Sequence, residues 1–72
     1  MNRQLLRKRR DELGMPQFEV AHRMGAAYRT FVRWEAGESE PRVSEYLAWC
    51  RVLDLDPAAA LTEPVEVAEV AG

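Results

Sequence analysis

The stretch QFEVAHRMGAAYRTFVRWEAG, residues 17–37, contains two amphipathic segments that are separated by a few small residues. Pro16 suits the first turn of a helix, and the apolar spacing that follows it predicts a helix over about residues 16–24. Gly25 ends this helix, because glycine readily adopts the left-handed conformation found just beyond helix ends. After two more residues, a second helix is predicted over about residues 28–36.

Four residues of this stretch predict that the two helices pack against each other at a sharp angle. Ala21 is small enough to let the helices approach closely, and Gly25 permits the sharp turn between them. Phe31 and Trp34 are three residues apart and therefore lie on one inward face of the second helix. Each residue alone is a weak signal, but the four within one short window predict a helix-turn-helix motif.

Outside this motif the chain also has helical patterns and almost no strand-like alternation. Residues 2–13 are rich in helix formers, with Asn2 as a candidate N-cap and Gly14 just past the end. A fourth helix is predicted over residues 43–53 and a short fifth helix over residues 57–61. We therefore expect an all-α fold, a compact bundle of about five short helices. The apolar residues expected to face inward outside the motif are Leu5, Leu6, Leu13, Val43, Tyr46, Leu47, Trp49, Cys50 and Leu53.

Residues 62–72 differ in kind from residues 1–61, which we expect to form the helix-turn-helix domain. Their apolar and polar residues alternate with a period of two, which is typical of a strand. A lone strand is not stable without a partner. This acidic C-terminal tail is therefore expected to be either disordered or a strand that pairs with its copy in a second subunit.

Charge is distributed unevenly along the 72 residues, whose formal net charge is −2. Residues 1–34 contain eight Lys and Arg against three Asp and Glu, a local balance of +5, whereas residues 35–72 have a balance of −7. A polyanion would therefore meet a basic first half in spite of the acidic total. Within that half, the run from Arg7 to Arg10 is either a solvated face or a site of phosphate attraction.

The composition argues against several classes of protein. The single Cys50 cannot form an internal disulfide, and one Cys with one His cannot supply the four ligands of a structural zinc site. We expect no metal and no cofactor. No apolar run is long enough to span a membrane and no signal peptide is evident, so a cytoplasmic protein is expected. An enzyme is the least supported class, because these residues offer no nucleophile–base pair and no paired carboxylates in a concave site.

Beyond the motif itself, further residues follow a known pattern. They are Arg10, Leu13-Gly14, Gln17, Val20-Ala21, Gly25, the run Arg33-Trp34-Glu35-Ala36-Gly37, Pro41 and the closing Val52-Leu53-Asp54-Leu55. With these residues, the sequence over about positions 3–61 resembles the Cro/cI-type (XRE-like) helix-turn-helix domains of phage and bacterial repressors. The resemblance implies a sequence-specific transcriptional regulator that binds double-stranded operator DNA as a homodimer and is similar to a small stand-alone repressor.

The resemblance also implies roles for particular residues. Arg10 and Glu35 match positions that commonly form an ion pair between the first and third helices. The third helix would enter the major groove of the DNA. The residues that would reach base edges are Tyr28, Arg29, Val32 and Arg33, and those that would contact the DNA backbone are Gln17, Thr30, Arg10 and Arg42.

The sequence departs from the family pattern at a few positions. Pro16 and Ala27 stand where relatives often have a Ser or Thr N-cap. Glu38 and Glu40 follow the third helix, where basic residues usually lie on the phosphates, so strong non-specific DNA binding is not expected. Phe18 stands where relatives are polar, and it is either an exposed apolar spot or part of a contact surface.

Two alternative functions follow from the same residues. One is a protein-interaction module, such as an antitoxin or a polymerase-contacting factor, that uses the helix-turn-helix as a scaffold. The other is a winged-helix regulator or excisionase of the MerR kind, which predicts a β-hairpin after Pro41. The dimer surface is also open. It would involve either the fourth and fifth helices, with Trp49 and Leu55, or the segment from Val65 to Val70.

Overall fold

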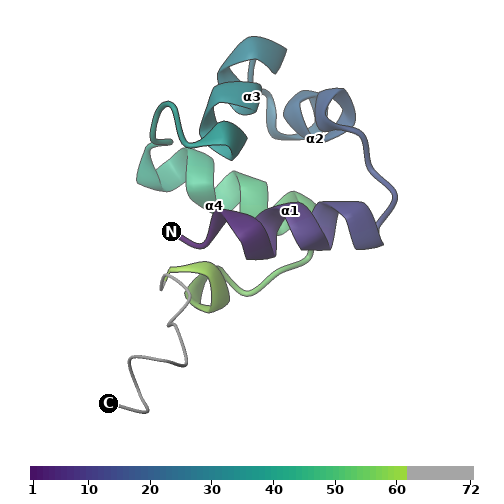
Figure 1. Ribbon diagram of the computed structural model, residues 1–72, viewed down its shortest axis with the longest axis vertical. Helices are drawn as coiled ribbons and strands as arrows, with labels where there is room; N and C mark the ends of the chain where they lie inside the picture. Colours follow the sequence, from purple (N-terminus) through teal and green to yellow (C-terminus); the bar gives the residue numbers. More distant parts are fainter. Residues whose placement is uncertain (62–72) are drawn as a thin grey trace.

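Four α-helices and a short 3-10 helix follow one another in residues 1–61, which are the residues that the computed structural model describes (Figure 1). They are α1 (Arg3–Glu12), α2 (Gln17–Met24), α3 (Tyr28–Ala36), α4 (Val43–Val52) and the 3-10 helix η1 (Pro57–Ala60). The described part is all-helical, as predicted, and none of its helices is long and apolar enough to cross a membrane. The alternating segment 62–72 lies outside the described residues.

The expectation of a fifth α-helix is wrong, because residues 57–60 form a single 3-10 turn. Ala59 N–H donates to the Asp56 carbonyl at 2.9 Å, which is the i to i+3 spacing of a 3-10 helix rather than the i to i+4 spacing of an α-helix. The Asp56 carboxylate accepts from Ala58 N–H at 3.1 Å and so caps this turn. Four residues are too few for a stable α-helix, so only the start signal at Asp56-Pro57 was correct.

Glycines end the two helices of the motif where the sequence predicts. Gly25 and Gly37 have φ angles of +76° and +83°, in the left-handed region that favours glycine. Ala26 N–H then donates to the Ala21 carbonyl at 2.9 Å, and Glu38 N–H donates to the Arg33 carbonyl at 2.9 Å. These bonds satisfy carbonyls that a helix end leaves free and turn the chain back against the helix it has just left.

The core is built around an aromatic cluster between α3 and α4. Trp49 is fully buried, with the Phe31 ring centroid 5.0 Å away in an edge-on arrangement and the Trp34 ring centroid 6.3 Å away and stacked. Phe31 and Trp34 are buried too, which confirms their predicted inward orientation. The buried apolar residues are Leu6, Val20, Ala21, Phe31, Trp34, Tyr46, Trp49, Cys50, Leu53 and Ala60.

Three residues that were expected to face inward are instead exposed. Val43 is 76% exposed, Leu47 is 40% exposed and Leu13 is 38% exposed. Helix α4 packs mainly against α2 and η1, and its Trp49 also meets the aromatic rings of α3. These neighbours leave Val43 and Leu47 largely uncovered. Trp49 cannot belong to a dimer surface, because its side chain has no exposed area. Leu55 is half-buried against the core.

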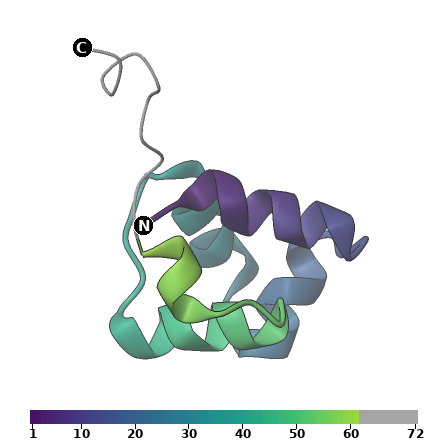
Figure 2. The ribbon, with the colours of Figure 1, turned by 90° about the horizontal axis from the view of Figure 1, so that it is seen from below.

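The helix-turn-helix lies at the opposite end of the domain from η1. In Figure 1, α2 and α3 form the upper part of the molecule, and Figure 2 shows η1 between α1 and α4. Asn2 N–H donates to the Ala60 carbonyl at 2.7 Å, so the start of α1 is joined to the end of η1.

We predict that Ala21→Leu lowers the free energy of unfolding by about 1–3 kcal/mol, because Ala21 is buried in a packed core that cannot take a larger side chain without strain. Urea unfolding followed by far-ultraviolet circular dichroism measures this loss. His22→Leu is the matched control: His22 is exposed, so this variant is expected to stay within about 0.5 kcal/mol of the wild type. Equal unfolding free energies for the two variants would contradict the close packing at Ala21.

Candidate nucleic-acid interface

The outward face of α3 brings the four candidate base-reading residues together. Tyr28, Arg29, Val32 and Arg33 line a shallow, open depression of about 380 Å³. Tyr28, Arg29 and Arg33 are exposed and Val32 is half-buried. A fifth residue, Glu38, completes the lining, and sequence reasoning placed it only in the loop after the helix. Gly37 was the sequence signal for the position of Glu38, because a glycine at the C-terminal end of a helix folds the next residue back against that helix.

Two of the candidate backbone contacts lie outside this depression. Thr30 is exposed on α3, and Arg42 is exposed at the N-cap position of α4. Arg42 N–H donates to the Glu45 carboxylate at 2.7 Å, a contact that orders the start of α4. Neither Thr30 nor Arg42 lines the depression.

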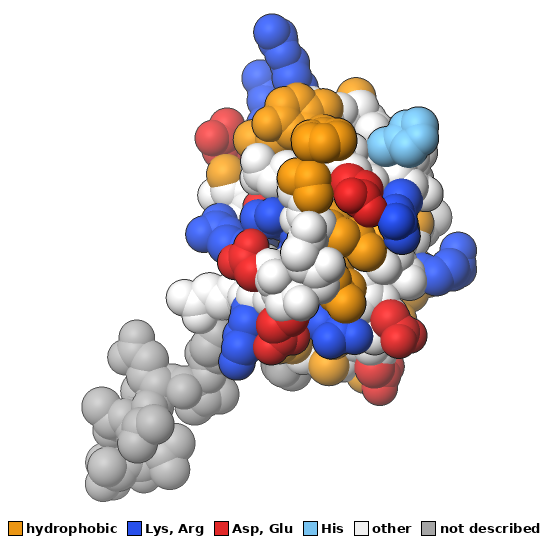
Figure 3. Space-filling view, turned by 90° about the vertical axis from the view of Figure 1, so that its right-hand side faces the viewer, with side chains coloured by type: hydrophobic (Ala, Val, Ile, Leu, Met, Phe, Trp, Pro, Cys, Tyr) orange, Lys and Arg blue, Asp and Glu red, His pale blue; other side chains and the backbone are white. Residues whose placement is uncertain are grey.

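Two aromatic residues on the helices of the motif are exposed. Phe18 on α2 is 65% exposed and Tyr28 on α3 is 53% exposed, so Phe18 is an exposed apolar residue as one of its two readings predicted. Figure 3 shows hydrophobic side chains gathered on the upper part of the face over the motif, with Lys or Arg side chains projecting above them. An aromatic surface under projecting cations can contact both the sugars and the phosphates of a nucleic acid.

Neither helix of the motif begins with a side-chain cap. The N-cap residues Pro16 and Ala27 make no side-chain hydrogen bond to the first turn, as the departures from the family pattern predicted. The first N–H groups of α2 and α3 are therefore not occupied by a capping side chain. Free N–H groups at a helix N-terminus, together with the helix dipole, attract anions such as phosphate.

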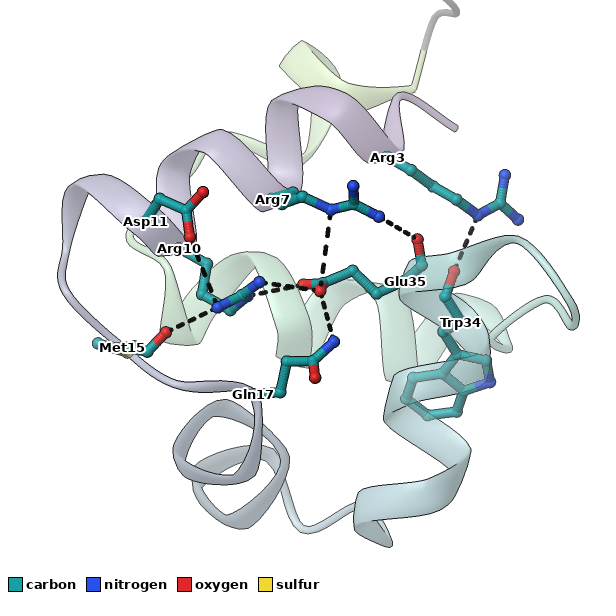
Figure 4. A network of polar contacts seen from close by, with 8 residues as sticks. All are labelled: Arg3, Arg7, Arg10, Asp11, Met15, Gln17, Trp34 and Glu35. Carbon is teal, nitrogen blue, oxygen red and sulfur yellow. Dashed lines mark hydrogen bonds and ion pairs between the residues drawn. The ribbon is translucent and has the colours of Figure 1, made fainter.

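A buried carboxylate joins α3 to α1 (Figure 4). Glu35 is only 2% exposed, and Arg10 donates to both of its oxygens, from Nε at 2.8 Å and from Nη2 at 3.0 Å. The hydrogen bond to this carboxylate raises the pKa of Arg10, so the guanidinium stays charged. Arg10 Nη1 also donates to the Met15 carbonyl at 3.0 Å. The Arg10 guanidinium thus binds Glu35 and Met15 within the protein, whereas the family resemblance also implied a phosphate contact for it.

Gln17 is held by the same carboxylate. Its amide Nε2 donates to Glu35 Oε1 at 2.8 Å, so the side chain points at the ion pair (Figure 4). This contact uses one amide N–H and leaves the second N–H and the amide oxygen for another partner. Glu35 therefore orients the side chain that the family resemblance assigns to a DNA phosphate.

Two more arginines of α1 bind the end of α3. Arg3 Nε donates to the Trp34 carbonyl at 2.9 Å, and Arg7 Nη2 donates to the Glu35 carbonyl at 3.4 Å. Together with Arg10 they form one stripe of α1, and Arg3 and Arg7 add hydrogen bonds to carbonyls at the end of α3. Arg3 also forms an ion pair with Glu40 in the following loop.

These internal contacts change which basic residues are available to a polyanion. Arg9 donates to the Leu53 carbonyl at 2.9 Å, and Arg23 pairs with Glu19 at 2.7 Å. Of the run from Arg7 to Arg10, Lys8 is the one without an ion pair to another residue of the described part. The basic residues with no such ion pair within residues 1–61 are Lys8, Arg29, Arg33, Arg42 and Arg51. Two of these five lie on the outward face of α3.

We predict that Arg10→Met lowers the free energy of unfolding by about 3–5 kcal/mol, because it leaves the buried Glu35 carboxylate without its main partner. Lys8→Met is the matched control, since Lys8 is exposed and unpaired among the described residues, and it should change stability by no more than about 0.5 kcal/mol. Chemical denaturation measures both. The double variant Arg10→Met with Glu35→Met is expected to recover part of the loss. A double variant less stable than the sum of the single ones would contradict the ion pair as the source of the effect.

Residues 6–59 match the sequence profile of a helix-turn-helix family, the Cro/C1-type or XRE-like family. No curated protein and no solved structure matches. The β-hairpin of a MerR-type protein is not formed after Pro41, where α4 follows within residues 43–52. The family match covers most of the domain and agrees with the glycine-ended helices and the buried Arg10–Glu35 pair, so the chain belongs to the Cro/C1-type helix-turn-helix family of DNA-binding regulators.

Proposed function

We propose that this protein is a small Cro-type repressor that binds operator DNA with α3 in the major groove. The observation that carries the proposal is the pair of arginines on the outward face of this helix. Arg29 and Arg33 are four residues apart, exposed, and without an ion pair to any other residue in 1–61. Most other arginines of the domain bind carbonyls or carboxylates of the protein itself. Arg29 and Arg33 have no such partner within residues 1–61, so they are suited to an external anion or hydrogen-bond acceptor.

The chemistry of this face fits base edges in the major groove. A guanidinium makes two parallel hydrogen bonds to guanine O6 and N7, which distinguishes guanine from the other bases. Val32 lies between the two arginines on the same face and offers an apolar contact for a thymine methyl group. Tyr28 lines the same depression as a further base-reading residue, and Thr30 flanks it with a hydroxyl group that can reach a phosphate.

The start of α2 provides a second point of contact with the DNA backbone. Its N-terminus has no side-chain cap, and the half-buried Gln17 has an amide N–H left over after its contact with Glu35. Both features favour a phosphate at this position. Glu35 also accepts hydrogen bonds from Arg10 of α1. One buried carboxylate of α3 therefore positions both Gln17 and the proposed reading helix. Such preorganisation reduces the entropy lost on binding.

We further propose that the protein binds as a symmetric homodimer through the exposed apolar residues of α4. Val43 and Leu47 are four residues apart, so they lie on one face of the helix, and no described residue covers them fully. In this proposal the two-fold axis passes through this face, and each copy of α3 enters one of two successive major grooves. The half-sites would then lie one helical turn apart, about 34 Å.

We predict that the double variant Arg29→Ala with Arg33→Ala loses selectivity for the operator while its melting temperature stays unchanged. Each lost bidentate contact should cost about 1–3 kcal/mol of discrimination. The logarithm of affinity should also fall less steeply with the logarithm of salt, by a slope of up to about 2. Fluorescence anisotropy on operator and scrambled duplexes over a salt series measures both quantities.

The control for this experiment is Lys8→Ala with Arg51→Ala, which removes the same charge from two exposed and unpaired positions on other helices. It should keep the selectivity of the wild type. If both double variants bind the operator equally well, α3 is not the reading helix. If the wild type itself binds no DNA at low salt, the protein-interaction module is the better function.

Selection of bound duplexes from a random pool tests the symmetry of the complex. We predict a palindromic motif with half-sites centred about one helical turn apart. Leu47→Glu should shift sedimentation toward the monomer and reduce affinity for the full site more than for a half-site. Lys8→Glu, a charge change on an exposed residue of α1, is the control. A motif with a single, non-repeated half-site would contradict the dimer.

A further inference from the structure

Two carboxylates follow α3 in the loop that leads to α4, and they differ in their partners. Glu40 forms an ion pair with Arg3, so its charge is balanced within the protein. The carboxylate of Glu38 is exposed and makes no hydrogen bond or ion pair with another residue of the described range. An uncompensated negative charge beside a DNA-binding surface needs an explanation, because it repels phosphates.

The backbone places Glu38 in the reading face rather than beside it. Gly37 adopts a left-handed conformation, and Glu38 N–H then donates to the Arg33 carbonyl at 2.9 Å. The loop is thereby folded against α3, and the Glu38 side chain lines the same depression as Arg29, Val32 and Arg33. The carboxylate still lies beyond ion-pair distance of both arginines, so it does not neutralise them.

A carboxylate can only accept hydrogen bonds, which restricts what it can recognise in a duplex. Phosphates and the acceptor edges of guanine and thymine repel it. The donors that the major groove presents are the amino groups of cytosine N4 and adenine N6. Beside arginines suited to guanine, the amino group of the cytosine paired with that guanine lies on the same groove edge, so a G·C pair satisfies both kinds of side chain.

Resting on the proposed function, we propose that Glu38 is a specificity-determining residue of the interface. Its carboxylate accepts a hydrogen bond from the amino group of a base, cytosine in the first place, at one position of each half-site. Where the duplex presents no amino group there, the same charge weakens binding. Glu38 thus raises the ratio of operator to non-specific affinity by penalising the wrong sequences as well as by contacting the right one.

The test compares three variants of the full chain by selection from a random duplex pool and by anisotropy on the selected and scrambled duplexes. Glu38→Gln removes the charge and adds a donor. Glu38→Asp keeps the charge but withdraws it by one methylene group. Glu12→Gln is the control, because it removes a carboxylate that lies 3.7 Å from Arg9 at the exposed end of α1, outside the depression.

For Glu38→Gln we expect the preference at one position of each half-site to fall about 5- to 30-fold. Its affinity for scrambled duplex should rise about fivefold, the effect of removing one like charge near a phosphate in water. Glu38→Asp should weaken the same base preference while its affinity for scrambled duplex stays at the wild-type value. Glu12→Gln should select the wild-type motif.

The proposal is overturned if Glu38→Gln and Glu38→Asp both select the same base as the wild type at every position, whatever happens to scrambled-duplex affinity. Circular dichroism of each variant confirms that it is folded. If the wild type selects no motif at all, the proposed function fails and this inference falls with it. A wild-type motif that the Glu38 variants retain overturns the role of Glu38 alone.

Discussion

The carboxylate of Glu35 is the group on which the arrangement of the first three helices depends. A carboxylate removed from water costs several kcal/mol unless it is paired and hydrogen-bonded. Here it receives a bidentate contact from Arg10 of α1 and a hydrogen bond from Gln17 of α2. Because the donors come from two other helices, the charge is satisfied only when all three helices are docked in one way. The pair therefore specifies the position of α3 as much as it stabilises it.

The internal use of arginine explains how a protein with a net charge of −2 can have a basic outward face on α3. Arg3, Arg7 and Arg10 bind the end of α3, where carbonyls and a buried carboxylate provide acceptors. Their charge helps to hold α3. It is not spread over the surface, where it would attract any polyanion. Arg29 and Arg33 are left exposed, and without an ion pair in residues 1–61, on the face of α3 that we propose reads the DNA.

Local signals predicted the helix-turn-helix well. Helices 17–24 and 28–36 begin and end within about one residue of their predicted bounds, because Gly25 and Gly37 act through their own backbone conformation. The prediction was weaker for α4. Its apolar residues suggested one wide buried face, whereas Val43 and Leu47 are exposed. Their burial depends on how much of α4 the neighbouring segments cover, and the spacing of residues along one helix contains no information about its neighbours.

The helices, their turns and the aromatic centre of the core follow from residues close together in the chain, since helix ends and helical periodicity are local properties. The family resemblance added the pairing of Arg10 with Glu35. Which arginines are free was settled by folding alone, through contacts such as that of Arg3 with Trp34, 31 residues away. The same holds for Glu38, which lines the depression on α3 because the loop folds back onto this helix. Counting charges along the chain cannot distinguish a neutralised group from an available one, because neutralisation depends on distances between segments that only the folded chain brings together.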